Sequence, residues 1–152
     1  MPKGLPKSVS VDQVPSNSRR GGDIRTLLSP KTVSSTTGFM GLLFLGPGEH
    51  VREHYHPYSE EFVYVVSGEM RMRFALPGPG GPDDWEFHFV PLRAGHGLVV
   101  PIGLRHRAEN AGGVPAEVVF SLSPLAPRPE LGHVDTEPEA EPVSGTPAVP
   151  RS

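Results

Sequence analysis

Apolar and polar residues alternate along the segment GEMRMRFAL, at residues 68–76. Met70, Met72 and Phe74 fall on one side of this alternation, and Arg71 and Arg73 fall on the other. Successive side chains of a β-strand point to opposite faces, so the pattern predicts a strand with one dry and one wet face. We expect the two methionines and the phenylalanine to face the interior of the domain.

The segment DWEFHFVPL, at residues 84–92, repeats this alternation. Trp85, Phe87 and Phe89 alternate with Glu86 and His88, and we expect the three aromatic side chains to face the same interior. The link between the two segments, ALPGPGGPDD, is rich in glycine and proline. It predicts a hairpin connection with an exposed tip.

Three further apolar segments predict strands: GFMGLLFLG at 38–46, EFVYVVSG at 61–68 and EVVFSLS at 117–123. The first of them contains Phe39 and is apolar on both faces, so we expect it to lie deep in the domain. No segment keeps a helical period. With about seven or eight strands and no helix to cover a sheet, the apolar faces must pack against each other in a sandwich or closed barrel.

Composition sets the limits of this all-β domain. The chain has 152 residues, of which 36% are hydrophobic, and this suits one compact domain. We place the domain at residues 23–124, after an N-terminal arm of residues 1–22. Residues 125–152 are rich in proline and glutamate and have no apolar period. We therefore expect a mostly mobile C-terminal tail that is dispensable beyond about Thr136.

Charge and residue usage exclude several classes of function. The chain has 14 Lys and Arg against 17 Asp and Glu, so it has no basic field for holding nucleic acid. It has neither an apolar leader nor a segment long enough to cross a membrane, and we expect a cytoplasmic protein. There is no cysteine, so a reactive site must use histidine, carboxylate or hydroxyl groups.

The segment EHYHPYSEEFVYVVSGE, at residues 53–69, carries candidate metal ligands. His54 and His56 are two residues apart, so on a strand both rings point to the same side. Glu61 begins the next strand and can face inward beside them. Glu60 would face outward, although a bulge after the turn at Pro57 would exchange the two glutamates.

A second cluster, GHGLVVPIGLRHRAEN at residues 95–110, supplies a fourth candidate ligand. Pro101 and Gly103 predict a turn, after which His106 enters another strand. Three neutral imidazoles and one carboxylate suit one divalent ion, and they leave coordination positions free for water or substrate. Zinc is the ion that we favour, with nickel, iron and manganese as alternatives.

The other histidines and several arginines have plainer interpretations. We expect the remaining histidines to be exposed or in loops rather than ligands: His50, His88, His96 and His133. Five arginines are either solvated charges or a surface for docking a carrier protein: Arg19, Arg20, Arg25, Arg105 and Arg107.

The spacing of both clusters resembles the two motifs of the cupin superfamily. The first runs from Gly48 through His54-x-His56 and Glu61 to Gly68, and the second from Gly95 through Pro101-x-Gly103-x-x-His106 to Asn110. The resemblance implies a jelly-roll barrel, also called a double-stranded β-helix. It also implies that the positions of His54, His56, Glu61 and His106 hold a metal ion inside the barrel.

A narrower resemblance rests on the segments RRGGDIRTLLSPKTV, HYHPYSEEFVYVVSGE and PLAPRPELGHVDTE. They are similar to the small single-domain cupins of bacterial aromatic polyketide pathways of the tetracenomycin and resistomycin type. Members of that group act as metal-dependent polyketide cyclases. Some of them use an all-histidine site, whereas this chain has Glu61 at the acidic position.

This resemblance implies an aldol-type ring closure of a poly-β-ketone, which an acyl carrier protein can carry, by a bacterial homodimer. The four ligand residues would form the catalytic site. The barrel wall would fold the substrate, and six residues are candidates for that wall: Phe39, Met70, Met72, Phe74, Phe87 and Phe89. Two alternatives stay open: an oxygenase that acts on an aromatic polyketide intermediate, and a non-catalytic partner of the synthase.

Overall fold

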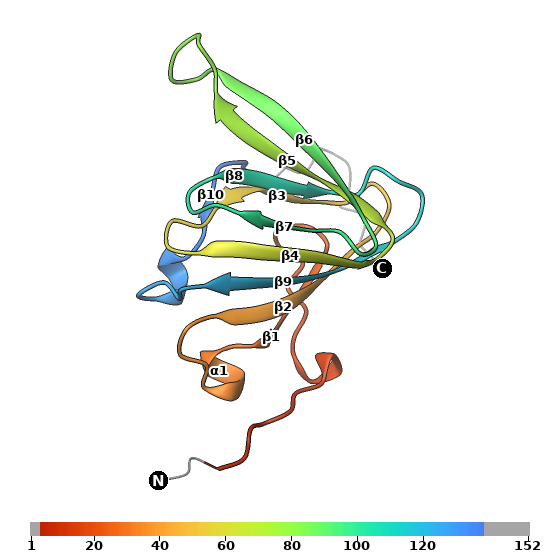
Figure 1. The fold of residues 1–152 in the computed structure, drawn as a ribbon, viewed down its shortest axis with the longest axis vertical. Coiled ribbons are helices and arrows are strands. Elements are labelled where there is room, and N and C mark those ends of the chain that lie inside the picture. The colour runs from red at the N-terminus through yellow and green to blue at the C-terminus, as the bar shows by residue number, and fades with distance from the viewer. Residues whose placement is uncertain (1–3, 139–152) are drawn as a thin grey trace, which may run out of the picture.

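Two antiparallel sheets face each other in the computed structural model of the chain, which describes residues 4–138 (Figure 1). The first sheet contains, in spatial order, β1 (Asp23–Leu28), β2 (Phe39–Leu45), β9 (Ala116–Ser123), β4 (Glu60–Ser67) and β7 (Gly97–Val100). The second contains β10 (Val134–Asp135), β3 (His50–Tyr55), β8 (Arg105–Glu109), β5 (Glu69–Pro77) and β6 (Trp85–Arg93). The predicted all-β fold is confirmed.

Helical structure within residues 4–138 is limited to three short elements. They are the 3-10 helices η1 (Val11–Gln13) and η2 (Pro129–Leu131) and the single-turn helix α1 (Pro30–Val33). Ser29 caps α1 by accepting a hydrogen bond from the backbone of Thr32, and Pro30 occupies the first turn, where no backbone donor is needed. In the described part of the chain, no helix is long and apolar enough to span a membrane.

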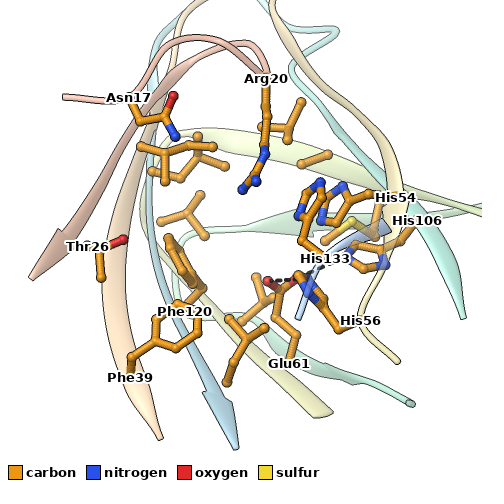
Figure 2. Close-up of a pocket in the computed structure, with 18 of the residues that line it drawn as sticks. Asn17, Arg20, Thr26, Phe39, His54, His56, Glu61, His106, Phe120 and His133 are labelled. Atoms are coloured by element: carbon orange, nitrogen blue, oxygen red, sulfur yellow. Dashed lines mark ion pairs between the residues drawn. The ribbon is translucent and has the colours of Figure 1, made fainter. Parts of the chain in front are cut away.

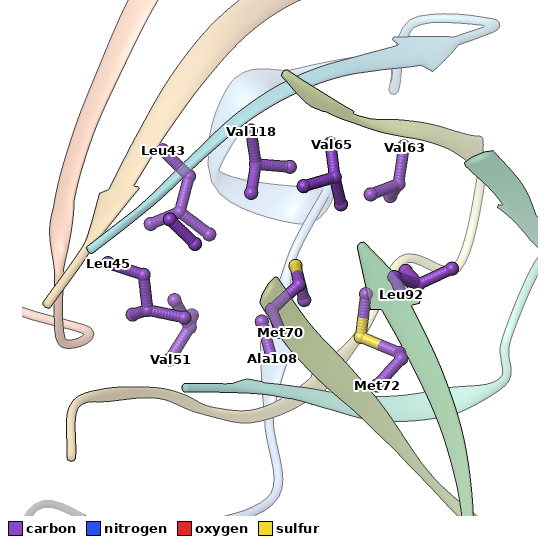
Figure 3. Close-up of a cluster of buried hydrophobic side chains, with 11 residues drawn as sticks. Leu43, Leu45, Val51, Val63, Val65, Met70, Met72, Leu92, Ala108 and Val118 are labelled. Atoms are coloured by element: carbon purple, nitrogen blue, oxygen red, sulfur yellow. The ribbon is translucent and has the colours of Figure 1, made fainter. Parts of the chain in front are cut away.

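The space between the sheets is filled by side chains that alternate along the strands. On β4, Val63 and Val65 are buried, whereas Phe62 and Tyr64 are exposed on the outer face, as the alternation predicts. The core contains eleven residues (Figure 3): Leu43, Leu45, Val51, Val63, Val65, Met70, Met72, Leu92, Ala108, Ala116 and Val118. Phe74 is partly buried against this core, so the expected inward direction of the β5 alternation is confirmed.

The aromatic residues of β6 lie on the outer face of the second sheet, and the expectation that they face the interior is wrong. Phe89 is paired with Arg73, and Phe87 with Ala75. Directly paired residues share a face, so the two phenylalanines lie with the arginines of β5. Their rings are about half exposed, at 50% for Phe87 and 49% for Phe89.

Stacking with cations explains why aromatic side chains are stable on this face. The guanidinium carbons of Arg71 and Arg73 lie 4.4 and 4.2 Å from the ring centroids of Phe89 and Phe87. Arg105 covers Trp85 in the same way, at 3.9 Å. Alternation therefore located the strand but not its inner face, because β6 is an edge strand whose aromatic side chains find arginine partners outside the barrel.

Parts of both terminal segments pack on the barrel, whereas the first described residues extend away from it (Figure 1). In the arm at residues 1–22, Val14 is buried and Asn17 forms a β-bridge with Ile24. At the other end, where we expected a mostly mobile tail from Leu125 onward, η2 lies at residues 129–131 and β10 pairs with β3. The hairpin tip at residues 78–84 is largely exposed, as predicted. Residues 139–152, most of the segment predicted to be dispensable, lie outside the described residues.

Candidate metal centre

The four predicted ligands meet inside the barrel, and they come from both sheets (Figure 2). His54 on β3 is paired with His106 on β8, and their ring centroids are 4.3 Å apart. His56 follows β3 directly, and its ring centroid lies 4.9 Å from that of His54. Glu61 on β4 approaches from the facing sheet. The three imidazoles are buried, and the Glu61 side chain is only 12% exposed.

A tight turn carries the chain into β8 and fixes the approach of His106. The backbone N–H of Gly103 donates to the carbonyl of His56 at 2.9 Å, and that of Leu104 donates to Pro101 at 3.2 Å. Gly103 has a φ of 80°, in the left-handed region that favours glycine. The turn therefore links the two clusters of candidate ligands through the main chain.

Backbone carbonyls orient all three imidazoles in the same way. Each ring places its Nδ1 within hydrogen-bonding distance of a main-chain oxygen. The pairs are His54 with Arg52 at 2.8 Å, His56 with Gly132 at 2.9 Å and His106 with Leu104 at 2.8 Å. A carbonyl can only accept, so each Nδ1 carries the proton, and a neutral ring then has a free lone pair on Nε2. This is how proteins prepare histidine for a metal ion.

The free nitrogen atoms face a carboxylate rather than a donor. Glu61 lies 3.1 Å from Nε2 of His106 and 3.5 Å from Nε2 of His56. Both nitrogen atoms are buried, and neither has a hydrogen-bond partner among residues 4–138. Acceptors that face each other in a buried site repel unless a cation lies between them. The donor set of His56, Glu61 and His106 therefore fits a divalent ion, and their ligand atoms lie within 4.8 Å of one another.

The pKa shifts of Glu61 and His106 indicate that a positive charge is favoured between these two side chains. Burial raises the pKa of Glu61, but the contacts with His106 and His56 outweigh burial and hold it well below its usual value. Burial lowers the pKa of His106, but the contact with Glu61 outweighs burial and raises that pKa, because a proton on Nε2 supplies the positive charge beside the carboxylate when no metal ion does. For His54, burial and the neighbouring His106 lower the pKa well below 6.5, which keeps this ring neutral.

A fifth side chain, His133, lies beside the candidate ligands, although we expected it to be an exposed or loop residue rather than a ligand. Its ring stacks on that of His54, with centroids 4.3 Å apart and planes 12° apart (Figure 2). Its Nε2 is 2.7 Å from Asp135. Burial lowers the pKa of His133 to about 4, the hydrogen bond to Asp135 opposes this, and the charge of Arg20 adds to it. His133, His54 and His56 form a second group of three that could hold an ion.

The pocket above the ligands has mostly apolar walls (Figure 2). Of the predicted wall residues, Phe39, Met70 and Met72 line it, whereas Phe74 packs in the core and Phe87 and Phe89 lie outside. Residues that the sequence did not single out complete the apolar wall: Ile24, Leu43, Val51, Val63, Ala108, Val118, Phe120 and Leu122. Asn17, Arg20 and Thr26 add polar groups.

The profile of the cupin family matches residues 11–131, which is most of the chain. The chain belongs to the cupin family. Polyketide synthase CurC of Streptomyces cyaneus is 52% identical over 92% of this chain and 84% of its own length. Protein SchB of Streptomyces halstedii is 54% identical over 85% of this chain and 86% of its own length. Tetracenomycin polyketide synthase protein TcmJ of Streptomyces glaucescens is 45% identical over 93% of this chain and 87% of its own length. The narrower resemblance drawn from the sequence is thereby confirmed.

Solved cupin structures support the jelly-roll barrel. Oxalate decarboxylase from Bacillus subtilis has a TM-score of 0.66 at 22% identity, and the match covers 83% of this chain and 30% of the decarboxylase. Oxalate oxidase has a TM-score of 0.61 at 23% identity, and the match covers 86% of this chain and 60% of the oxidase. This cupin chain thus spans less than a third of the decarboxylase and less than two thirds of the oxidase. At these identities the likeness shows the fold, and the predicted jelly roll is confirmed.

The choice between the two glutamates of this cupin is clear from their positions. Glu61 contacts the imidazoles, whereas Glu60 is exposed at the start of β4. No bulge displaces the strand at this point, since Glu60 and Glu61 pair in register with Ser123 and Leu122. Their roles toward a metal ion stay predictions.

The remaining histidines lie outside the pocket, as expected. His50 lies 3.6 Å from Glu137, and His88 and His96 are exposed. Most of the arginines also have partners elsewhere. Arg25 pairs with Asp23, Arg107 with Glu109 and Glu137, and Arg105 with Trp85, while Arg19 is exposed. Arg20 differs from these, since it lines the pocket.

Proposed function

We propose that this cupin is a metal-dependent polyketide cyclase, which closes a ring in a poly-β-ketone by aldol addition. The observation that carries this proposal is the set of free Nε2 atoms and the Glu61 carboxylate, which converge at one end of an apolar pocket. The Streptomyces relatives support the pathway, because two of them are named as polyketide synthase proteins.

His54, His56, His106 and Glu61 would hold one divalent ion in each chain. Zinc is the ion that we favour, and nickel, iron and manganese suit the same ligands. When bound, such an ion acts as a Lewis acid that polarises a carbonyl oxygen and stabilises the negative charge that develops there.

The proposed ring closure balances without an oxidant or a reductant. A methylene group between two carbonyl groups loses a proton, and its carbon forms a bond to the carbon of a distant ketone. The oxygen of that ketone gains a proton and becomes a hydroxyl group. Loss of one water molecule then makes the new ring unsaturated, so the product differs from the substrate by the mass of water alone.

The barrel wall would decide which ring forms. Phe39 and Phe120 contact each other edge to face, with centroids 6.4 Å apart, and they line the pocket opposite the ligands (Figure 2). Met70 and Met72 line it from the other sheet. A rigid apolar wall excludes water and orders a flexible chain, so that one carbon meets one carbonyl.

An assay without oxygen separates this proposal from the alternatives. A minimal synthase would be reconstituted under nitrogen, with and without the cupin, and the products compared by mass spectrometry and chromatography. We expect the cupin to change the pattern of cyclised products without oxygen. Product that forms only with oxygen, and that gains oxygen atoms, would identify an oxygenase instead. An unchanged product pattern would indicate a non-catalytic partner of the synthase.

The partners of the protein are also proposals. We propose that the polyketide reaches the pocket on an acyl carrier protein, and that the cupin works as a cytoplasmic homodimer. Sedimentation equilibrium tests the second point, because a homodimer has twice the 16.4 kDa of the chain.

A further inference from the structure

Two hydrogen-bond donors face the pocket from the turn that precedes β1. Asn17 and Arg20 both line the pocket, on the side away from Glu61 (Figure 2). Figure 2 shows the Arg20 guanidinium reaching from this turn toward the rings of His54 and His133. The positive charge of Arg20 acts on His133, in agreement with that placement. The metal ligands and these donors therefore face the same space.

The turn that carries the donors is fixed by the main chain. Asn17 and Ile24 exchange two backbone hydrogen bonds of 2.8 and 3.0 Å, and the carbonyl of Arg20 accepts from the N–H of Arg52 at 2.8 Å. Gly21 has a φ of 101°, and a Cβ at this position would lie 1.8 Å from the carbonyl oxygen of His50. Only glycine permits this close approach, so the turn is held against β3 with Arg20 above the pocket.

The side chains of this turn direct hydrogen-bond donors, rather than acceptors, into the pocket. The Oδ1 of Asn17 accepts from the N–H of Arg19 at 3.1 Å, and Figure 2 shows the amide nitrogen on the pocket side. Within residues 4–138, no carboxylate or carbonyl forms a hydrogen bond or ion pair with the Arg20 guanidinium. Burial lowers the pKa of Arg20; the charge of Asp135 opposes this, and the charges of Arg19 and Arg52 add to it. An arginine that is partly desolvated without a partner favours a ligand with anionic oxygen atoms.

We propose that Arg20, together with Asn17, binds the enolate oxygen atoms of a 1,3-dicarbonyl unit in the substrate. A 1,3-diketone enolate is planar and spreads one negative charge over two oxygen atoms, which suits the planar fork of a guanidinium group. With Arg20 and a divalent ion in the pocket, Glu61 alone does not balance the positive charge, so an anion is favoured over a neutral ketone. This inference rests on the proposed function and names the form of substrate that the site holds.

The test uses binding rather than turnover. Zinc-loaded protein would be titrated with acetylacetone, a small 1,3-diketone, by calorimetry and by the ultraviolet absorbance of its enolate. Four proteins would be compared: wild type, Arg20→Gln, Arg20→Lys and Arg19→Gln. The last is the matched control, because Arg19 is the exposed neighbour of Arg20. Zinc content and melting temperature would be measured on the same samples.

We expect Arg20→Gln to weaken acetylacetone binding roughly ten- to a hundredfold, the loss that follows from removing a hydrogen bond to a charged group. Arg20→Lys should recover part of the affinity, and Arg19→Gln should leave it unchanged. Asn17→Asp gives an independent test. It keeps the acceptor for the N–H of Arg19 but replaces the donor by an anion, so it should also weaken binding.

Other outcomes would overturn the inference. Equal affinity in wild type and Arg20→Gln, with equal zinc content, would show that Arg20 does not bind the enolate. So would acetate binding as tightly as acetylacetone with the same dependence on Arg20, since the site would then accept any carboxylate. Neither result contradicts the proposed ring closure, which the synthase assay tests separately. Conversely, acetylacetone binding that depends on Arg20, without ring closure in the synthase assay, would contradict the proposed cyclase function. It would still support the enolate-binding site.

Discussion

Each imidazole of the candidate centre is oriented by a main-chain carbonyl, so the folded backbone, rather than a network of side chains, prepares the site. Glu61 is the candidate ligand whose side chain comes from the opposite sheet. The sequence identified these residues, because strand alternation places residues two apart on the same face and the spacing repeats the cupin motifs. The sequence left open which of Glu60 and Glu61 faces the site, since one bulge would exchange them. The register of β4 decides between them.

Replacing Glu61 tests the ligand set most simply. Glu61→Gln keeps the shape of the side chain but removes the negative charge, and we expect metal affinity to fall more than the roughly 10–100-fold that loss of an outer-shell partner costs. Glu60→Gln is the matched control, because Glu60 is the exposed neighbour, and it should bind metal like wild type. Competition with a chromogenic chelator measures both affinities. Equal affinity in the two variants would contradict the assignment of Glu61.

The pocket wall offers a second test with single residues. Phe39→Ala and Phe120→Ala enlarge the pocket without touching a ligand, so we expect a changed ratio of cyclised products at unchanged metal content. Phe87→Ala is the control on the outer face and should not change the ratio. Removing a buried phenylalanine costs about 3–5 kcal/mol, and these half-buried rings should cost less. Chromatography of products from folded variants measures the ratio, and a constant ratio would mean that regiochemistry is set elsewhere.

At the scale of elements, the C-terminal segment completes the site. The carbonyl of Gly132 orients His56, and η2 and β10 bring His133 over His54. This segment has no periodic pattern of apolar residues, because a two-residue strand and one 3-10 turn are too short to produce one. A polar, proline-rich composition predicted mobility, yet pairing of β10 with β3 and the hydrogen bond from the N–H of Thr136 to Glu53 hold the segment in place.

Two truncations separate the packed segment from the residues that follow. A chain that ends at Arg128 loses η2, β10 and the carbonyl partner of His56, and we expect its metal affinity to fall by roughly 10–100-fold or more. A chain that ends at Pro138 keeps all of these contacts, and we expect it to bind metal normally. Isothermal titration with zinc compares the two. Normal affinity after truncation at Arg128 would show that the segment does not support the centre.

Asn110 joins elements at the opposite end of the barrel. Its buried amide nitrogen donates to the carbonyls of Leu45 and Val114, and its oxygen accepts from the N–H of Gly112. Asn110→Ala leaves these groups unpaired, and we expect the free energy of unfolding to fall by about 1–3 kcal/mol. Urea denaturation measures this loss. An unchanged midpoint would mean that water replaces the lost bonds without cost.

At the scale of the whole molecule, three segments far apart in the sequence meet at one pocket. Those segments carried the resemblance to polyketide cyclases, and they contribute Arg20, the candidate ligands His54 and His56, and His133. The sequence predicted the barrel and its two motifs, since alternation and spacing are local signals. It did not predict that the arm and the tail close the pocket, because their contacts depend on where the barrel places them. The inner face of β6 was missed for the same reason, as arginines on the neighbouring strands cover its aromatic rings.

We propose that one metal ion in this pocket makes the protein a cyclase. The most direct measurement is a titration of metal-free protein with zinc, in which bound metal and the rate of ring closure by a reconstituted synthase are followed together. We expect both to rise in parallel and to saturate at one ion per chain, and we expect His54→Ala and His106→Ala to lower both. Full ring closure by metal-free protein, or metal binding that leaves ring closure unchanged, would contradict it.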